Sequence, residues 1–204
     1  MNGNGQQDIK RDRILEAAYK RFLHYGYSKT TMNDVAADLS MSKALLYYYF
    51  CDKSEVYTAV MRKLANEYFK TLAAKINDFD TLKAAFVYQV DEQHNFILNN
   101  YNFFDFFRLN EQNLPDGIWE IINDIRQMEV ETLSNVLKAE AGKGIIMPID
   151  NPEIVVDLLL DALQGVRVGA ASGKKILFPR QEHLDEIHNK RLLLIDIFIR
   201  GLMN

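Results

Sequence analysis

The sequence has little of what builds disulfide-linked, turn-rich or membrane-spanning proteins. Its single cysteine, Cys51, cannot form an intramolecular disulfide and cannot alone complete a cysteine-rich zinc site. Four prolines and ten glycines in 204 residues are too few for the evenly spaced turns of an all-β chain. No apolar run is long enough for a transmembrane helix, and the first residues lack the basic and apolar regions of a secretory signal. We therefore expect a cytoplasmic protein that has no membrane partner.

The remaining composition is typical of a soluble globular protein, with 48% hydrophobic and 25% charged residues. The net charge of −4 is unevenly distributed along the chain. Through Lys53, eight bases oppose six acids, so this first quarter carries +2 and the remainder carries −6. This asymmetry is compatible with a DNA-binding first segment joined to an acidic body.

Helical periodicity runs through almost the whole chain and predicts an all-α protein of about nine helices. Residues 1–8 are polar and are expected to form a disordered tail. Short helices over 9–26, 31–39 and 43–49 form a predicted helix-turn-helix domain over residues 9–53. Residues 54–204 form a predicted effector-binding and dimerisation domain. Its helices are predicted over 53–76, 81–98, 100–109, 115–141, 152–171 and 181–202, and the segments 145–149 and 175–178 are interpreted as loops.

Local signals mark the helix ends of the first domain. Gly26 is expected to end the first helix. Thr31 and Asp34 have the spacing of a capping box, with aspartate in place of the usual glutamate. Ser42 can cap the third helix. Asp52 begins a second segment with capping-box spacing, which predicts the start of a long fourth helix.

Two short helices joined by a tight turn, after a helix with a basic outer face, describe a helix-turn-helix unit. If Leu46 and Phe50 pack on the first helix, the opposite face of the third helix carries small, hydroxylated and cationic side chains. Such a face can enter the major groove of DNA. Its residues are Lys43, Ala44, Tyr47 and Tyr48, and the neighbouring Thr31, Tyr49 and Lys53 are of types that contact phosphate.

The same connectivity also occurs in helical bundles that bind no DNA. Consecutive helical residues point about 100° apart, so the three tyrosines at 47–49 cannot all be buried. At least one phenol therefore faces solvent, which favours a partner for this helix.

These residues resemble the signature of the tetracycline-repressor (TetR) family of bacterial regulators. The resemblance covers roughly residues 10–56 and rests on Gly26, Thr30-Thr31, Val35-Ala36, Ser42-Lys43, the run from Leu46 to Phe50, and Lys53. It implies a homodimer with an N-terminal DNA-binding domain and a C-terminal domain for effector binding and dimerisation.

The resemblance also implies roles for single residues. Thr31, Tyr47, Tyr49 and Lys53 match positions that contact DNA, chiefly phosphate, and Lys43 to Leu45 match positions that read bases. Ala44 replaces a frequent glycine and Leu45 a common threonine, so few direct hydrogen bonds to bases are expected. The full set of predicted DNA-binding residues is Thr31, Ser42, Lys43, Ala44, Leu45, Tyr47, Tyr48, Tyr49 and Lys53.

The second domain contains six aromatic residues between positions 96 and 107, a stripe that is either core or the wall of a cavity. If a cavity exists, its aromatic wall predicts a small, largely hydrophobic effector. The candidate effector-binding residues are Tyr88, Phe96, Tyr101, Phe104, Trp119 and Gln164.

The last two predicted helices have apolar faces too broad to be covered by one neighbour. A two-fold interface between two copies of the chain would bury them. The candidate interface residues are Leu158, Ala162, Gly165, Val166, Leu194, Ile195, Phe198 and Leu202.

Nothing in the sequence points to an enzyme, a cofactor or a metal centre. The four histidines are scattered, and neither a phosphate-binding glycine loop nor a nucleophile elbow is present. A redox role for Cys51 stays open. We expect a dimeric transcription regulator, most simply a repressor, that binds a palindromic operator and is released by a small molecule. The alternative is a helix-turn-helix relative that has lost DNA binding and acts as a ligand-binding or protein-interaction module.

Overall fold

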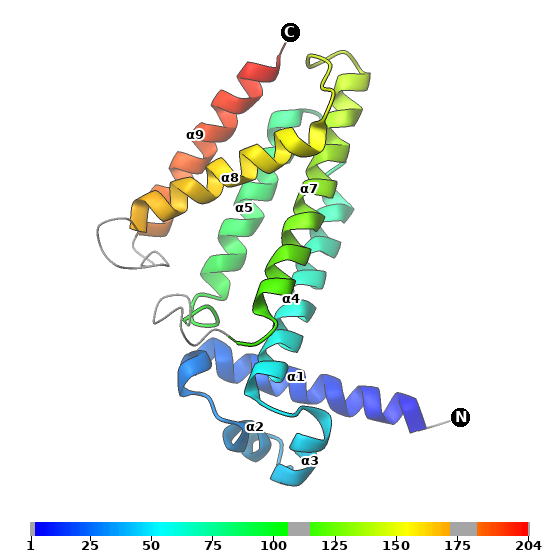
Figure 1. The fold of residues 1–204 in the computed structure, drawn as a ribbon, viewed down its shortest axis with the longest axis vertical. Coiled ribbons are helices and arrows are strands. Elements are labelled where there is room, and N and C mark those ends of the chain that lie inside the picture. Colours follow the sequence, from blue (N-terminus) through cyan, green and yellow to red (C-terminus); the bar gives the residue numbers. More distant parts are fainter. Residues whose placement is uncertain (1–2, 106–114, 172–182, 204) are drawn as a thin grey trace. The chain divides into compact units, whose positions relative to one another are not determined.

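The computed structural model describes residues 3–105, 115–171 and 183–203, and every regular element in these ranges is a helix (Figure 1). The predicted all-α class is therefore confirmed, with eight helices in the described ranges where about nine were expected. Their bounds are α1 Gly3–Lys29, α2 Met32–Asp38, α3 Lys43–Tyr49, α4 Lys53–Lys75, α5 Leu82–Asn99, α7 Ile118–Gly142, α8 Pro152–Ala171 and α9 Leu184–Leu202.

The helix predicted over 100–109 is not seen in the described part of that range. Residues 101–105 form turns, and the rest of the prediction lies outside the described residues. The segment 145–149 is irregular, as expected, apart from a bridge between Ile146 and Met203. The segment 175–178 also lies outside the described residues. Helix α1 begins at Gly3, before the predicted start at residue 9, and none of the described helices is long and apolar enough to cross a membrane.

The chain divides into two compact units. Unit 1 comprises residues 1–66 and 100–122, so it contains α1 to α3 and the first part of α4. Its core lies where α2 packs on α1 and on α3. Ile14, Phe22, Val35 and Leu46 are completely buried there, as the apolar spacing of these helices predicts.

Unit 2 comprises residues 67–99 and 123–204. In this unit α9 packs on α5 and on α8, and hydrophobic side chains form the core of the unit. Phe86 on α5, Leu137 on α7 and Ile195 on α9 are completely buried. This core leaves one side of α8 and one side of α9 without a covering neighbour in the described chain, since Leu158 and Leu193 are 68% and 60% exposed.

Candidate nucleic-acid interface and effector domain

The short helix α2 begins at the capping box that the sequence predicts. Thr31 has an extended backbone, its side-chain oxygen accepts a hydrogen bond from the backbone N–H of Asp34, and the Asp34 carboxylate accepts one from the backbone N–H of Thr31. The Thr31 hydroxyl also donates to the same carboxylate at 2.7 Å and lowers the pKa of Asp34. Both side chains therefore hold the exposed N-terminus of α2 in place.

Helix α3 begins at Ser42, whose hydroxyl accepts a hydrogen bond from the backbone N–H of Leu45 at 3.2 Å. The helix is only two turns long, and Leu46 is its buried residue. Because helical residues three and four apart share a face, burial of Leu46 turns the opposite side outward. The exposed residues of α3 are Lys43, Ala44, Leu45, Tyr47 and Tyr48.

The predicted reading face of α3 is thus solvent-exposed in unit 1. The Lys43 ammonium lies 5.7 Å from the centre of the Tyr47 ring. Tyr48 is 70% exposed, and its hydroxyl accepts a hydrogen bond from the Gln7 amide at 3.4 Å. Tyr49 is half-buried and packs edge-on against Tyr48 at 5.3 Å. This face offers one positive charge and two exposed phenols to a partner.

Lys53, at the start of α4, is held more tightly than the sequence suggests. Its ammonium donates to the backbone carbonyl of Tyr27 at 2.9 Å and lies 4.1 Å from the centre of the Tyr27 ring. Burial lowers the pKa of Lys53. The residue therefore links α1 to α4 in addition to any contact with phosphate.

Arg21 performs a positioning role that sequence reasoning missed. Its guanidinium donates two hydrogen bonds to the carboxylate of Asp38, at 2.6 and 2.8 Å, and lies 3.7 Å from Asp34. The fork geometry fixes α1 against α2. Arg21 and Asp38 are 17 residues apart, so no local sequence pattern predicts their contact.

The end of α1 is built around Gly26, which has a φ of 79°. Its neighbour Tyr27 donates its backbone N–H to the Asp105 carboxylate at 2.8 Å. A β-carbon at position 26 would lie 2.2 Å from an oxygen of that carboxylate. Phe103 also holds the turn at 101–105. Its ring stacks on that of Tyr57 with 4.4 Å between the ring centres, and its backbone carbonyl accepts a hydrogen bond from the Tyr57 hydroxyl. The sequence marked Gly26 as a helix end and gave no sign of Asp105 as its partner.

Cys51 is exposed, and its surroundings keep the thiol protonated. Hydrogen bonding to Glu55, with a further contribution from Asp52, raises the pKa of the Cys51 thiol to about 11. Reactive cysteines have the opposite shift, because the thiolate is the nucleophile.

The predicted effector-binding residues do not come together in one described cavity. Tyr101, Phe104 and Trp119 belong to unit 1, whereas Tyr88, Phe96 and Gln164 belong to unit 2. Phe104 is buried in core and Trp119 is 60% exposed. Of the six residues, Gln164 lines a cavity among those described.

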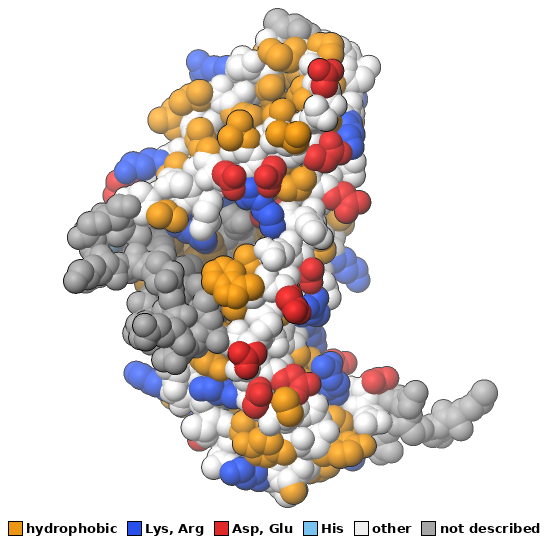
Figure 2. Space-filling view, viewed as in Figure 1, with side chains coloured by type: hydrophobic (Ala, Val, Ile, Leu, Met, Phe, Trp, Pro, Cys, Tyr) orange, Lys and Arg blue, Asp and Glu red, His pale blue; other side chains and the backbone are white. Residues whose placement is uncertain are grey.

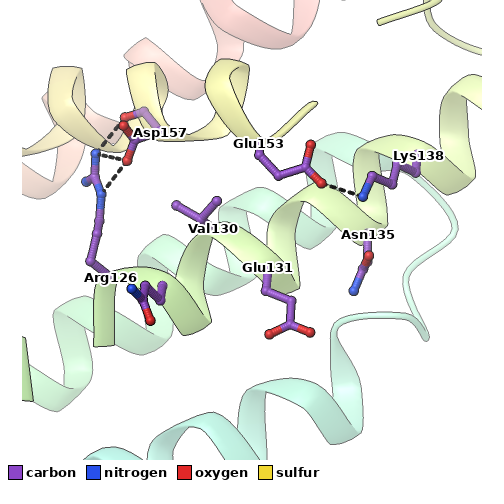
Figure 3. A pocket seen from close by; sticks show the side chains of 8 residues that line it. Arg126, Val130, Glu131, Asn135, Lys138, Glu153 and Asp157 are labelled. Atoms are coloured by element: carbon purple, nitrogen blue, oxygen red, sulfur yellow. Dashed lines mark hydrogen bonds and ion pairs between the residues drawn. The ribbon is translucent and has the colours of Figure 1, made fainter. Parts of the chain in front are cut away.

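Two hollows can be described in unit 2. The larger, of about 500 Å³, is a groove between α7 and α8 (Figure 3). Ion pairs bridge it, with Arg126 contacting Asp157 at 2.7 Å and Lys138 contacting Glu153 at 2.5 Å. Its charged side chains therefore hold α8 on α7.

The smaller hollow, of about 60 Å³, is named the arginine cavity here. It contains three arginines and one carboxylate that is almost fully buried, that of Glu129. The sequence analysis named Gln164 as a candidate effector-binding residue but did not identify Arg191 or Glu129. The residues that line the cavity are Gln93, Arg126, Glu129, Leu160, Leu163, Gln164, Arg167 and Arg191.

The predicted dimer residues fall into two groups. Leu158, Ala162 and Gly165 lie on the exposed side of α8, where hydrophobic side chains gather on the surface (Figure 2). Ile195 and Leu202 lie in the core of unit 2 instead, because the face of α9 that carries them packs within its own chain. The other predicted residues, Val166, Leu194 and Phe198, are half-buried. The exposed apolar residues of α9 are Leu193 and Ile197, which the sequence did not single out.

Comparisons with known proteins agree with the geometry of unit 1. Residues 14–60 match the family model of bacterial regulatory proteins of the tetR family. The biofilm operon negative transcriptional regulator IcaR of Staphylococcus epidermidis is 27% identical over 90 residues, which is 41% of this chain and 49% of IcaR. The chain thus matches about half the length of that relative. The probable acrEF/envCD operon repressor of Escherichia coli is 22% identical over 168 residues, covering 76% of this chain and 73% of the repressor.

Solved structures share the fold along almost the whole chain. A transcriptional regulator from Cytophaga hutchinsonii has a TM-score of 0.83 at 24% identity, covering 96% of this chain and 99% of its own. The triclosan complex of SmeT, the Stenotrophomonas maltophilia repressor of an efflux pump, has a TM-score of 0.65 at 18% identity and covers 95% and 91%. The capped helices and the exposed face of α3 thus lie within residues 14–60, the segment that matches the family model of bacterial regulatory proteins of the tetR family.

Proposed function

We propose that this protein is a ligand-responsive transcription regulator that binds a palindromic operator as a homodimer and represses until an effector releases it. The observation that carries the proposal is the exposed face of α3, where Lys43, Tyr47 and Tyr48 stand opposite the buried Leu46. A two-turn helix with one side anchored and the other free is the geometry of a recognition helix in a major groove. Its neighbour, the capped N-terminus of α2, offers backbone N–H groups to phosphate.

Exposed apolar residues on two helices of unit 2 support the proposed dimer. On α8, Ile154 and Leu158 are 66% and 68% exposed and four residues apart. On α9, Leu193 and Ile197 are 60% and 59% exposed with the same spacing. Two such stripes on the same unit suit an isologous interface, in which the same helices of both copies meet. The small residues of α8 allow that approach to be close.

Two chain segments can couple effector binding to α3. Helix α4 belongs to both units, and the turn at 101–105 follows α5 directly. This turn binds the end of α1 through Asp105 and the middle of unit 1 through Phe103. An effector that changes the position of α5 therefore changes the base of the helix-turn-helix. It releases DNA only if it binds the two states with different affinity.

The test is retardation of DNA from the protein's own upstream region at several salt concentrations. A regulator should bind with an affinity that falls steeply as salt rises. Lys53→Ala should lower the slope of log affinity against log salt by about one unit, and Lys43→Ala should relax sequence preference. Lys190→Ala, which removes an exposed lysine of α9, is the matched control and should change neither. Absence of retardation at low salt would overturn the proposal and favour a module without DNA binding.

A further inference from the structure

The first turns of α1 lie against the C-terminal end of α3, at the edge of its exposed face. The Gln7 amide donates a hydrogen bond to the hydroxyl of Tyr48, which belongs to that face. One helical turn further along α1, the Arg11 guanidinium lies 4.9 Å from the centre of the Phe50 ring, directly after the last residue of α3. Two contacts one turn apart therefore place this stretch of α1 alongside the end of α3.

The charged residues of these turns point to different sides of α1. Gln7 and Arg11 are four residues apart, so they share the side that meets α3. The Asp12 carboxylate lies 3.9 Å from the ammonium of Lys63 on α4, so its charge is partly balanced there. Arg13 is two residues beyond Arg11, which places it about 160° further around the helix. Arg11 is therefore the arginine of these turns that lies beside α3.

Arg11 is held in place without being neutralised. Phe50 is 1% exposed, so its ring is fixed in the core of unit 1, and the face of an aromatic ring attracts a guanidinium group above it. The Arg11 side chain is itself exposed, and none of the ion pairs between described residues involves it. Its positive charge therefore remains available to an anion that approaches α3.

The width of the major groove determines what this cation can reach. A helix with its side chains is about 10–12 Å across and the groove is about 12 Å wide, so α3 alone fills it. A second helix that lies against the end of α3 therefore meets the wall of the groove, which is the sugar-phosphate backbone. Phosphate oxygens match the fork of N–H donors on a guanidinium group.

We propose that Arg11 contacts a backbone phosphate of the operator, so that the DNA interface extends from α3 onto the first turns of α1. This inference rests on the proposed function, because it requires a duplex on α3. The positive charge of Arg11 and the continuity of this surface with the exposed face of α3 favour the DNA backbone as the partner. The contact adds affinity but no sequence information, since every base pair carries the same phosphates.

Retardation of a duplex from the protein's own upstream region, measured with the full-length protein between 50 and 200 mM salt, tests the contact. Each lost phosphate contact should lower the slope of log affinity against log salt by about 0.9, so the affinity lost over this range becomes about 3.5-fold smaller. Arg11→Gln should show this decrease, and it should weaken binding to this duplex and to an unrelated duplex to the same extent.

Two matched variants serve as controls. Arg11→Lys keeps the positive charge and should keep the wild-type slope. Arg13→Gln removes an exposed arginine from the far side of the same helix and should also keep it. If Arg11 only covered the Phe50 ring, Arg11→Gln would lower the melting temperature and leave the slope unchanged, so the melting temperature of each variant is measured as well.

The outcomes separate this contact from the regulator itself. A wild-type slope in Arg11→Gln, or an equal decrease in Arg13→Gln, overturns the Arg11 contact while the proposed regulator stands. A wild-type protein that retards no DNA even at low salt overturns the proposed function and the contact with it.

Discussion

Replacement of Gly26 by alanine should strongly destabilise unit 1. Gly26 has φ 79° and ψ 171°, a backbone conformation almost restricted to glycine. Forcing alanine into it costs about 1–3 kcal/mol. The new β-carbon would also lie 2.2 Å from Oδ2 and 2.5 Å from Cγ of Asp105, so this carboxylate must move. Its hydrogen bond from the Tyr27 N–H would be lost, which costs about 1.5–3 kcal/mol for a charged acceptor.

The expected loss is therefore about 2.5–6 kcal/mol of the free energy of unfolding, a large part of the stability of a typical domain. Urea denaturation followed by circular dichroism measures it, at one protein concentration because a dimer couples stability to concentration. Gly201→Ala is the control, since this position on α9 has open space around its β-carbon and should change stability by less than about 1 kcal/mol.

A double-mutant cycle separates the two causes. Asp105→Ala alone removes the acceptor of the Tyr27 N–H, and Gly26→Ala/Asp105→Ala keeps the backbone strain without the overlap. The double variant should lose less stability than the sum of the single variants, by about the energy of one hydrogen bond. If Gly26→Ala unfolds within about 1 kcal/mol of the wild type, the overlap and strain assigned to this corner are wrong.

Three further predictions concern the cap of α2, the dimer and the histidines. Thr31→Ala removes the capping box, so the free energy of unfolding in urea should fall by about 0.5–2 kcal/mol and DNA retardation should weaken. Thr31→Ser keeps the hydroxyl and should leave both near their wild-type values. Leu158→Glu places a charge on the exposed stripe of α8 and should yield a monomer in sedimentation, whereas a dimer in this variant would place the interface elsewhere. Burial lowers the pKa of His188, and so does repulsion from His94, whose ring centre lies 4.2 Å from that of His188. The His188 side chain therefore binds a proton more readily in the unfolded chain than in the folded one. Neutral His188 therefore does not reduce the free energy of unfolding above about pH 6.5. Below that pH, protonation of His188 in the unfolded chain lowers the free energy of unfolding. His188→Gln should flatten the melting temperature between about pH 5 and 7, and an unchanged slope would contradict the assignment.

The sequence predicted the parts of the site whose causes are local. Thr31 and Asp34 are three residues apart, and their capping box is present as expected. Burial of Leu46 and exposure of Tyr48 on α3 follow from helical spacing within a single short helix. Neither depends on which other part of the chain lies nearby.

The same spacing rules were insufficient for α9. Its apolar residues are distributed around more than one face, so periodicity could not say which face meets the core. The structure buries Ile195 and Leu202 against its own chain and exposes Leu193 and Ile197. The packing of α9 on α5 determines which face is buried, so the candidate dimer surface of α9 is the face that carries Leu193 and Ile197.

By itself, then, the sequence determined where most helices begin, which side of a short helix is apolar, and that residues 10–56 resemble the signature of the TetR family. Only the tertiary structure decided that Asp105 receives the N–H of Tyr27 from 78 residues away, and that Arg191 meets Gln93 across 98. Capping and amphipathicity act over a few residues along the chain and leave a readable pattern. Contacts between distant segments exist because helices pack side by side, and no local spacing records which side chains will meet there.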